Sequence, residues 1–147
     1  MAVAVQVLVT ISVVSFAVVA AAADLNRTHA TNPRWVGHAR FHVVWQVITH
    51  IGVGLLALVL TWAPVGDLRV RLAVAMAIAG VVLGGFFLSA ATMRCYDGEL
   101  ADPNGYRPLT ARVGGRRVVV DKNVLLFLGG SAPLVAALAL FALAKGV

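Results

Sequence analysis

Residues 41–62, FHVVWQVITHIGVGLLALVLTW, decide the fold, because they contain no Asp, Glu, Lys or Arg. A helix of about 20 mainly apolar residues is long enough to cross a hydrocarbon core of about 30 Å. Three other runs share this length and character, at residues 2–23, 72–92 and 124–144. The sequence therefore predicts an integral membrane protein with four transmembrane helices.

The composition of the whole chain agrees with this prediction. The 147 residues are 61% hydrophobic and 12% charged, whereas soluble domains average about 45–50% apolar and about 25% charged residues. Little sequence remains for a separate soluble domain, so we expect residues 1–147 to form one domain. We predict an all-α membrane protein, an antiparallel four-helix bundle. The single cysteine, Cys95, excludes an intrachain disulfide.

Basic residues are concentrated in the first and third connections, residues 24–40 and 93–122. These two segments hold Arg27, Arg34, Arg40, Arg94, Arg107, Arg112, Arg116, Arg117 and Lys122, against Arg69, Arg71 and Lys145 elsewhere. By the positive-inside rule, we predict that both connections form a cap in the cytoplasm and that both termini lie outside. The location is the plasma membrane if the protein is bacterial. We attribute the net charge of +6 to this orientation, and predict no nucleic-acid partner.

The third connection carries a β-hairpin signal. Two short runs containing Val, Thr and Arg flank Gly114 and Gly115 in LTARVGGRRVVV, and a glycine pair between β-prone runs is typical of a tight hairpin turn. An isolated hairpin is marginally stable in water. We therefore expect it to pack against the loop that carries Trp35 or against the helix ends.

Small and polar residues within the spans predict contacts between helices. Gln6, Thr10, Ser12 and Ser15 are expected to hydrogen-bond to a neighbouring helix, as polar side chains in a span usually do. Gly80 and Gly84 have the GxxxG spacing that allows close helix approach. We expect this pair to support packing inside the bundle rather than dimerisation.

All four histidines lie between Thr28 and His50, in THATNPRWVGHARFHVVWQVITH. His38, His42, Gln46 and His50 recur every four residues, which places them on one slowly turning stripe of a helix. Because a helix rises about 1.5 Å per residue, His38 and His42 can share one ion or substrate, whereas His50 lies deeper in the span.

Acidic side chains of the two connections can join this stripe, because the topology brings both connections to one membrane face. We predict His42 as the acid–base group or metal ligand, His38 as its partner, and Asp24, Glu99 or Asp97 as the orienting carboxylate. Further ligand-binding candidates are His29, Asn26, Trp35, Trp45, Gln46 and His50, with Cys95 nearby. A His-x3-His pair with a carboxylate suits zinc, or iron if positions stay open. Metal binding, metal-free acid–base chemistry and a purely structural cluster remain open alternatives.

One phrase of the sequence resembles a family signature. It reads Asp24-x-Asn26-x-Thr28-His29, then Asn32-Pro33-x-Trp35, then His38-Ala39-x-Phe41-His42. This phrase resembles the signature of a family of small four-span membrane proteins of bacteria and fungi, a resemblance that implies no particular activity. The layout is also similar to emopamil-binding, sigma-2-receptor-like and DoxX-like four-helix membrane proteins. That similarity implies a lipid-accessible cavity.

Two functions from different classes follow. The first is a histidine-rich site at the cytoplasmic mouth of the bundle that binds or acts on a lipophilic small molecule, with or without a metal. The alternative is a non-catalytic accessory or structural subunit of a membrane complex. The expected partners are the lipid bilayer and either a homo-oligomer or a larger membrane complex.

Overall fold

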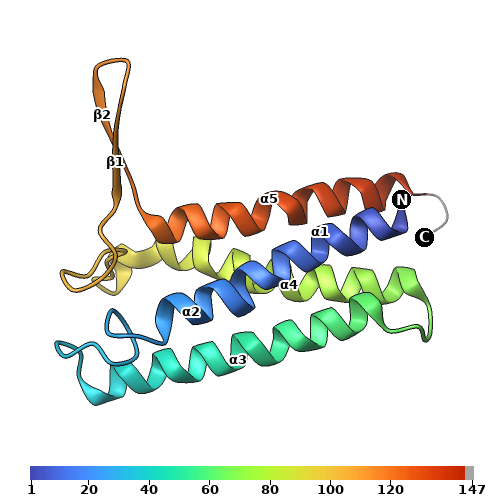
Figure 1. Cartoon of the computed structure of the whole chain (residues 1–147), viewed down its shortest axis with the longest axis horizontal. Coiled ribbons are helices and arrows are strands. Elements are labelled where there is room, and N and C mark those ends of the chain that lie inside the picture. Colours follow the sequence, from blue (N-terminus) through green and yellow to red (C-terminus); the bar gives the residue numbers. More distant parts are fainter. Residues whose placement is uncertain (145–147) are drawn as a thin grey trace.

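The computed structural model describes residues 1–144 and contains four long apolar helical segments in an antiparallel bundle (Figure 1). The first span consists of α1 (Ala2–Val14), a π-helical turn (Ser15–Val19) and α2 (Ala20–Asp24); the others are α3 (Gly37–Trp62), α4 (Leu68–Thr92) with a 3-10 turn (Met93–Cys95), and α5 (Lys122–Leu143). Each is long and apolar enough to cross a membrane. The predicted fold class is confirmed, and the chain is an integral membrane protein in contact with lipid. Lys145 lies outside the described residues.

Three spans begin earlier than the apolar runs suggest: α3 begins at Gly37 rather than at residue 41, and aspartate caps extend α4 and α5. α4 starts at Leu68 rather than at residue 72, because the Asp67 carboxylate accepts the backbone N–H of Val70 at 2.9 Å. α5 starts at Lys122 after Asp121, whose carboxylate accepts the backbone N–H of Asn123 at 2.7 Å. Aspartate N-caps satisfy helix N–H groups that have no partner within the helix. The two caps therefore add a polar first turn to α4 and to α5.

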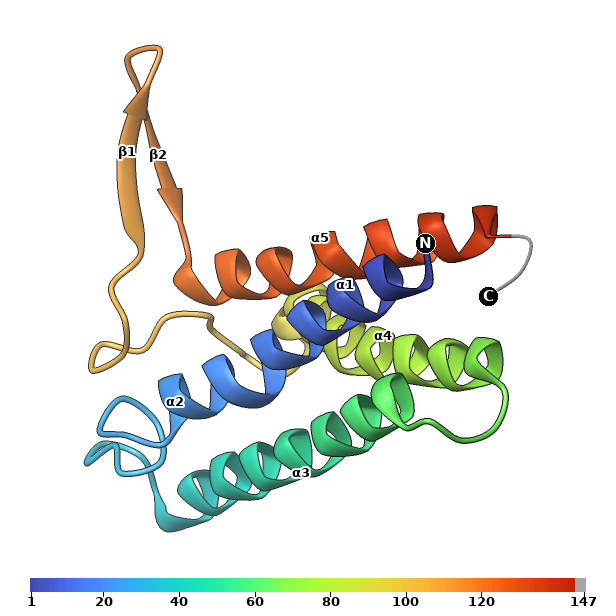
Figure 2. The same cartoon turned by 45° about the vertical axis from the view of Figure 1, so that its right-hand side comes forward.

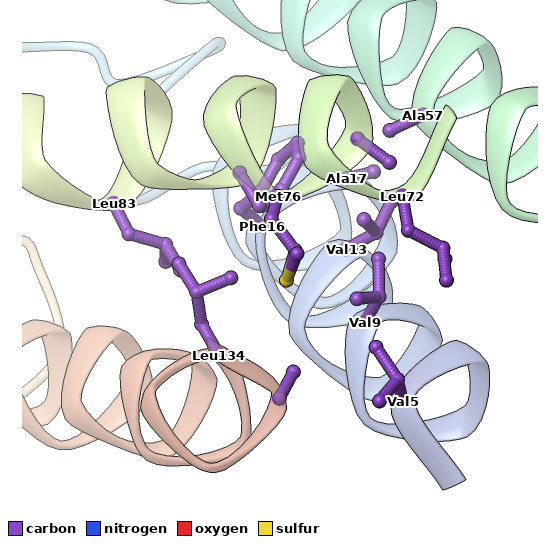
Figure 3. Close-up of a cluster of buried hydrophobic side chains, with 13 residues drawn as sticks. Val5, Val9, Val13, Phe16, Ala17, Ala57, Leu72, Met76, Leu83 and Leu134 are labelled. Carbon is purple, nitrogen blue, oxygen red and sulfur yellow. The ribbon is translucent and has the colours of Figure 1, made fainter. Parts of the chain in front are cut away.

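The first span is the central element of the bundle. Val5, Val9 and Val13 follow a four-residue spacing and are fully buried, so they form one stripe along the helix. This stripe belongs to one apolar core that includes Met76 of α4 and Leu134 of α5 (Figure 3). The core therefore lies around α1, and the outer helices present their other faces to lipid.

A π-helical turn, Ser15–Val19, lies where the first span comes closest to its neighbours. A Cβ atom added to Gly54 of α3 would lie 2.5 Å from the Cβ of Ala17, and one added to Gly130 of α5 would overlap the side chain of Ser15. Real Cβ atoms do not approach this closely, so only glycine leaves room for these two contacts. Such π turns widen a helix by one residue and are frequent at functional sites.

The expectation for Gly80 and Gly84 is wrong. A Cβ atom added to either residue, or to Gly85, would meet no atom within 4 Å among the described residues. The surface of α4 at these glycines is therefore open, and no other helix in the described part of the chain approaches it closely.

Polar contacts join the first span to α3 at the end of the bundle that carries the α3–α4 connection. The Gln6 side-chain amide donates to the Thr61 carbonyl at 2.8 Å, and the Trp62 indole N–H donates to the Thr10 hydroxyl at 2.9 Å. The prediction is confirmed for Gln6 and Thr10 and wrong for the two serines: Ser15 donates to the Ser12 carbonyl of its own span at 2.6 Å, and the buried Ser12 hydroxyl has no partner among the described residues. The two interhelical bonds satisfy polar side chains inside apolar spans, where an unpaired group is costly.

The hairpin is confirmed, but its expected packing is wrong. β1 (Leu109–Val113) pairs antiparallel with β2 (Arg116–Val120), and Gly114 and Gly115 adopt φ angles of 56° and 79°. Every residue of both strands except Val120 is exposed. Figures 1 and 2 show the hairpin projecting sideways from the end of the bundle, away from the loop of Trp35.

We predict that Gly54→Ala lowers the free energy of unfolding by about 1–3 kcal/mol, since its new methyl group would overlap Ala17 and force the helices apart. Gly80→Ala is the matched control. It adds the same methyl group on a span where nothing lies within 4 Å, so it should be neutral or slightly stabilising. Thermal unfolding of both variants in detergent micelles measures the difference. Equal stability of the two variants would contradict the close contact.

Candidate functional site

A buried asparagine joins the first and third connections at one end of the bundle. The Asn32 side-chain amide is fully buried and donates to the Thr28 carbonyl at 3.0 Å and to the Asp102 carboxylate at 3.3 Å. Its oxygen accepts from the Asn104 side chain at 3.2 Å. The second Asp102 oxygen accepts the Trp35 indole N–H at 2.9 Å. These bonds hold the two connections together as a cap.

Asp102 is the carboxylate that organises this cap, and sequence reasoning missed this role. Its Oδ1 also accepts the backbone N–H of Asn104 at 2.7 Å. The indole N–H of Trp35 first, and then the Asn104 backbone N–H and the Asn32 amide, favour the charged carboxylate and hold the pKa of Asp102 below its ordinary value of 3.8. The available signal was the turn-forming run Asp-Pro-Asn-Gly, although its partners in the first connection were not visible in the sequence.

A cavity of 270 Å³ lies between the cap and the ends of the helices. Its polar lining consists of Asp24, His29, Trp35, Gln46, His50, Glu99 and Asn123. Its apolar lining includes Val43 and Leu126, together with Phe86 and Phe127, whose rings are stacked with centroids 3.9 Å apart. The structure therefore brings six of the predicted site residues to one cavity, from the first span, both connections and α3.

Neighbouring side chains fix the proton position on His29. Asn26 is oriented because its amide nitrogen donates to the Ala23 carbonyl at 2.7 Å and its oxygen accepts the backbone N–H of Thr28 at 2.8 Å. The Thr28 hydroxyl donates to this Asn26 oxygen at 2.6 Å, and its oxygen lies 2.8 Å from Nδ1 of His29. Because the hydroxyl has one hydrogen, Nδ1 must be the donor in that contact. In the neutral ring, Nε2 of His29 is then the nitrogen without a hydrogen.

Asp24 stands beside this histidine. Oδ1 of Asp24 lies 3.7 Å from Nδ1 of His29, and both side chains are about one-fifth exposed. The His29 ring meets the edge of the Trp35 ring at 5.5 Å between centroids. A carboxylate and an imidazole thus lie side by side in the cavity wall, and both are groups that general acid–base chemistry uses.

A groove of 590 Å³ adjoins the cavity within the membrane-spanning region. The two hollows share the lining residues Gln46, His50, Phe86 and Phe127. The rest of the groove is mainly apolar and lies between α3 and α4, where Gly85 leaves space and Thr49 and Ser89 are the polar exceptions. His50 thus stands where the polar cavity meets the apolar groove, with its ring 6.1 Å from that of Phe16.

His38 and His42 lie apart from this cavity, on an outward face of α3. Their Nε2 atoms are 3.0 Å apart and both side chains are exposed. The His42 ring contacts Trp45, at 5.7 Å between centroids, and Phe41. Among residues 1–144, no group of three or more His, Cys, Asp and Glu side chains is placed to hold a metal ion. A zinc or iron site at this pair would need further ligands from water or a second chain.

Of the candidates in the third connection, Glu99 lines the cavity, and Asp97 and Cys95 do not. Glu99 is exposed and lines the cavity. Asp97 and Cys95 are also exposed, and Asp97 occupies a turn with φ of 54°. In the first connection, Asn26 contacts His29 indirectly, through the Thr28 hydroxyl. The structure thus offers Asp24 and Glu99 as carboxylates for the cavity.

Comparisons with protein-family models, with curated proteins and with solved structures found no match to this chain. The architecture is that of a small four-span membrane protein, because four long apolar helices account for most of the chain. The similarity to emopamil-binding, sigma-2-receptor-like and DoxX-like proteins stays a prediction from layout.

Acidification should release Trp35 from the cap. Because the folded pKa of Asp102 is depressed, its bonds stabilise the cap above the ordinary aspartate value of 3.8, and this stabilisation is lost as the pH falls through the folded pKa. The assigned indole N–H resonance of Trp35, followed by NMR in micelles as the pH is lowered, should report this loss. Asp102→Asn keeps an acceptor without a titrating charge, so it should abolish the transition. A transition at the same pH in both proteins would contradict this role for Asp102.

Proposed function

We propose that this protein binds an amphipathic lipophilic molecule, with its polar end in the cavity and its apolar body in the groove. The observation that carries the proposal is the junction of the two hollows at His50 and Gln46. Ligand pockets typically occupy about 300–1,000 Å³, and the groove lies in this range. A molecule dissolved in the bilayer could enter the groove between α3 and α4 without crossing the cap.

The chemistry of the cavity favours a ligand whose polar end carries a hydroxyl or amine group. Such a group can donate a hydrogen bond to the carboxylate of Asp24 or Glu99, and it can exchange a proton with Nε2 of His29. Trp35 and Phe127 add aromatic surface beside these polar groups. The roles predicted for His42 and His38 thus pass to His29 and His50 in this proposal.

An enzymatic version of the proposal uses the same residues. His29 would accept a proton from the ligand at Nε2 and return it, while Asp24 stabilises the protonated ring and Thr28 holds the ring in place. A positioned acid–base group of this kind typically accelerates a reaction by about 10²–10⁴-fold. The nature of the bond that reacts would depend on the ligand.

A second candidate function is that of an accessory subunit, and one specific observation favours it. The outward face of α3 carries a run of rings in mutual contact, from His38 through Phe41 and His42 to Trp45. This exposed aromatic surface suits a contact with a second copy or with another protein of a membrane complex. Under either function we place the cap in the cytoplasm, as the distribution of arginine predicts.

Substitution of the cavity histidines should release the ligand. We expect that His29→Ala/His50→Ala, purified in mild detergent, retains about 10–100-fold less of a lipophilic molecule that copurifies with the wild type, because two hydrogen bonds of about 0.5–1.5 kcal/mol each are lost. Mass spectrometry of extracts measures this amount. His38→Ala/His42→Ala is the matched control and should retain the molecule.

A second pair of variants tests the groove. Gly85→Leu should fill it and displace the same molecule, whereas Gly80→Leu should not, because Gly80 is outside the groove lining. Equal ligand content in all four variants would contradict the proposed function. Loss from His38→Ala/His42→Ala alone would move the site to the outward face of α3.

Elemental analysis tests whether His38 and His42 bind a metal. If His38 and His42 bind zinc or iron, elemental analysis of the purified protein should find a stoichiometric metal that His38→Ala/His42→Ala loses and His29→Ala/His50→Ala keeps. Equal metal content in all three proteins would contradict it.

A further inference from the structure

The hairpin that projects from the cap has two chemically different faces. Residues opposite each other in an antiparallel pair share a face, and the register pairs Leu109 with Val120, Ala111 with Val118, and Arg112 with Arg117. One face therefore carries Leu109, Ala111, Val113, Val118 and Val120, with Arg116 near the turn. The other carries Thr110, Arg112, Arg117 and Val119. The hairpin thus has a mainly apolar face and a basic face that carries the opposed pair Arg112 and Arg117.

The apolar face is uncovered in the described part of the chain. Val113 is 65% exposed, Leu109 49% and Val118 40%. A two-stranded hairpin without cover is at best marginally stable in water. Its apolar face needs a partner from outside the bundle.

The charge of the hairpin indicates what that partner is. Residues 103–120 contain four arginines and no acidic residue. Arg112 and Arg117 stand directly opposite each other, and like charges in this position repel. The flanking carboxylates are occupied: Asp102 accepts from Trp35, and Asp121 caps α5. An anionic partner would relieve the repulsion.

The position of the hairpin places it at the membrane surface. β2 ends at Val120, and α5 begins two residues later at Lys122, so the hairpin is attached directly to a membrane-spanning helix. Figures 1 and 2 show that it runs across the direction of the four helices. Because the helices cross the bilayer, a segment transverse to them at their end runs along the bilayer surface.

We propose that the hairpin is an interfacial anchor for anionic phospholipids. Its apolar face rests on the boundary of the acyl chains, and Arg112 and Arg117 bind lipid phosphates from the other face. Charge complementarity supports this partner, as does continuity with the lipid-facing surface of α5. Arginines near an anionic leaflet and apolar side chains at its boundary both favour such binding. The anchor is independent of the cavity ligand.

The test uses the full chain in nanodiscs, with an environment-sensitive fluorophore on a Val113→Cys variant in a Cys95→Ser background. We expect the probe to be shielded from water in discs that contain phosphatidylglycerol and exposed in pure phosphatidylcholine discs, with high salt reversing the shielding. Arg112→Gln/Arg117→Gln should lower the ratio of shielded to exposed probe by about tenfold or more. Arg27→Gln/Arg94→Gln removes the same charge from exposed positions off the hairpin and should leave the ratio unchanged.

A probe at Val119→Cys, on the basic face, checks the orientation and should stay more exposed than the probe at Val113. Retention of the wild-type elution volume shows that each variant keeps its bundle. Shielding that is independent of anionic lipid would overturn the proposal, and so would shielding that disappears on dilution of the protein, which would identify a second copy as the partner. Shielding produced by inorganic phosphate in pure phosphatidylcholine discs would also overturn it.

Discussion

The close contact between the middle of the first span and two glycines is the constraint on which the bundle depends. Gly54 admits Ala17, and Gly130 admits Ser15, so α3 and α5 both approach the same π-helical turn. His50 precedes Gly54 by four residues and therefore shares its face of α3. The contact that packs the helices thus also turns His50 inward, toward Phe16 and the cavity.

The cap lies over the cavity, at the ends of the helices, and polar contacts hold the cap together. Asn32 and Trp35 both bind the carboxylate of Asp102, which joins segments far apart in the sequence. Hydrogen bonds to a charged carboxylate are stronger than hydrogen bonds between neutral groups. Apolar packing therefore builds the membrane-spanning part, whereas a carboxylate network builds the cap that carries His29.

For the histidines of α3, the sequence predicted the helix that carries them but not which of them face the cavity. The four-residue spacing correctly placed His38, His42 and His50 on one helix. A helix has 3.6 residues per turn, so each step of four advances the direction by about 40°. Three steps turn His50 by about 120° away from His38. This rotation puts His38 outside the cavity and His50 in its wall, and the sequence could not say at which step the boundary falls.

The local sequence by itself determined which helices and strands form. Runs of apolar residues predicted the four spans, because each must satisfy its own backbone in lipid, and Gly114 with Gly115 predicted the hairpin turn. Only the tertiary structure decided that Gly54 and Gly130, and not Gly80 and Gly84, make the close contacts. It also decided that the hairpin stays uncovered and that Asp102 organises the cap. These outcomes depend on the rotation and spacing of whole helices, which are set by contacts between residues distant in the chain.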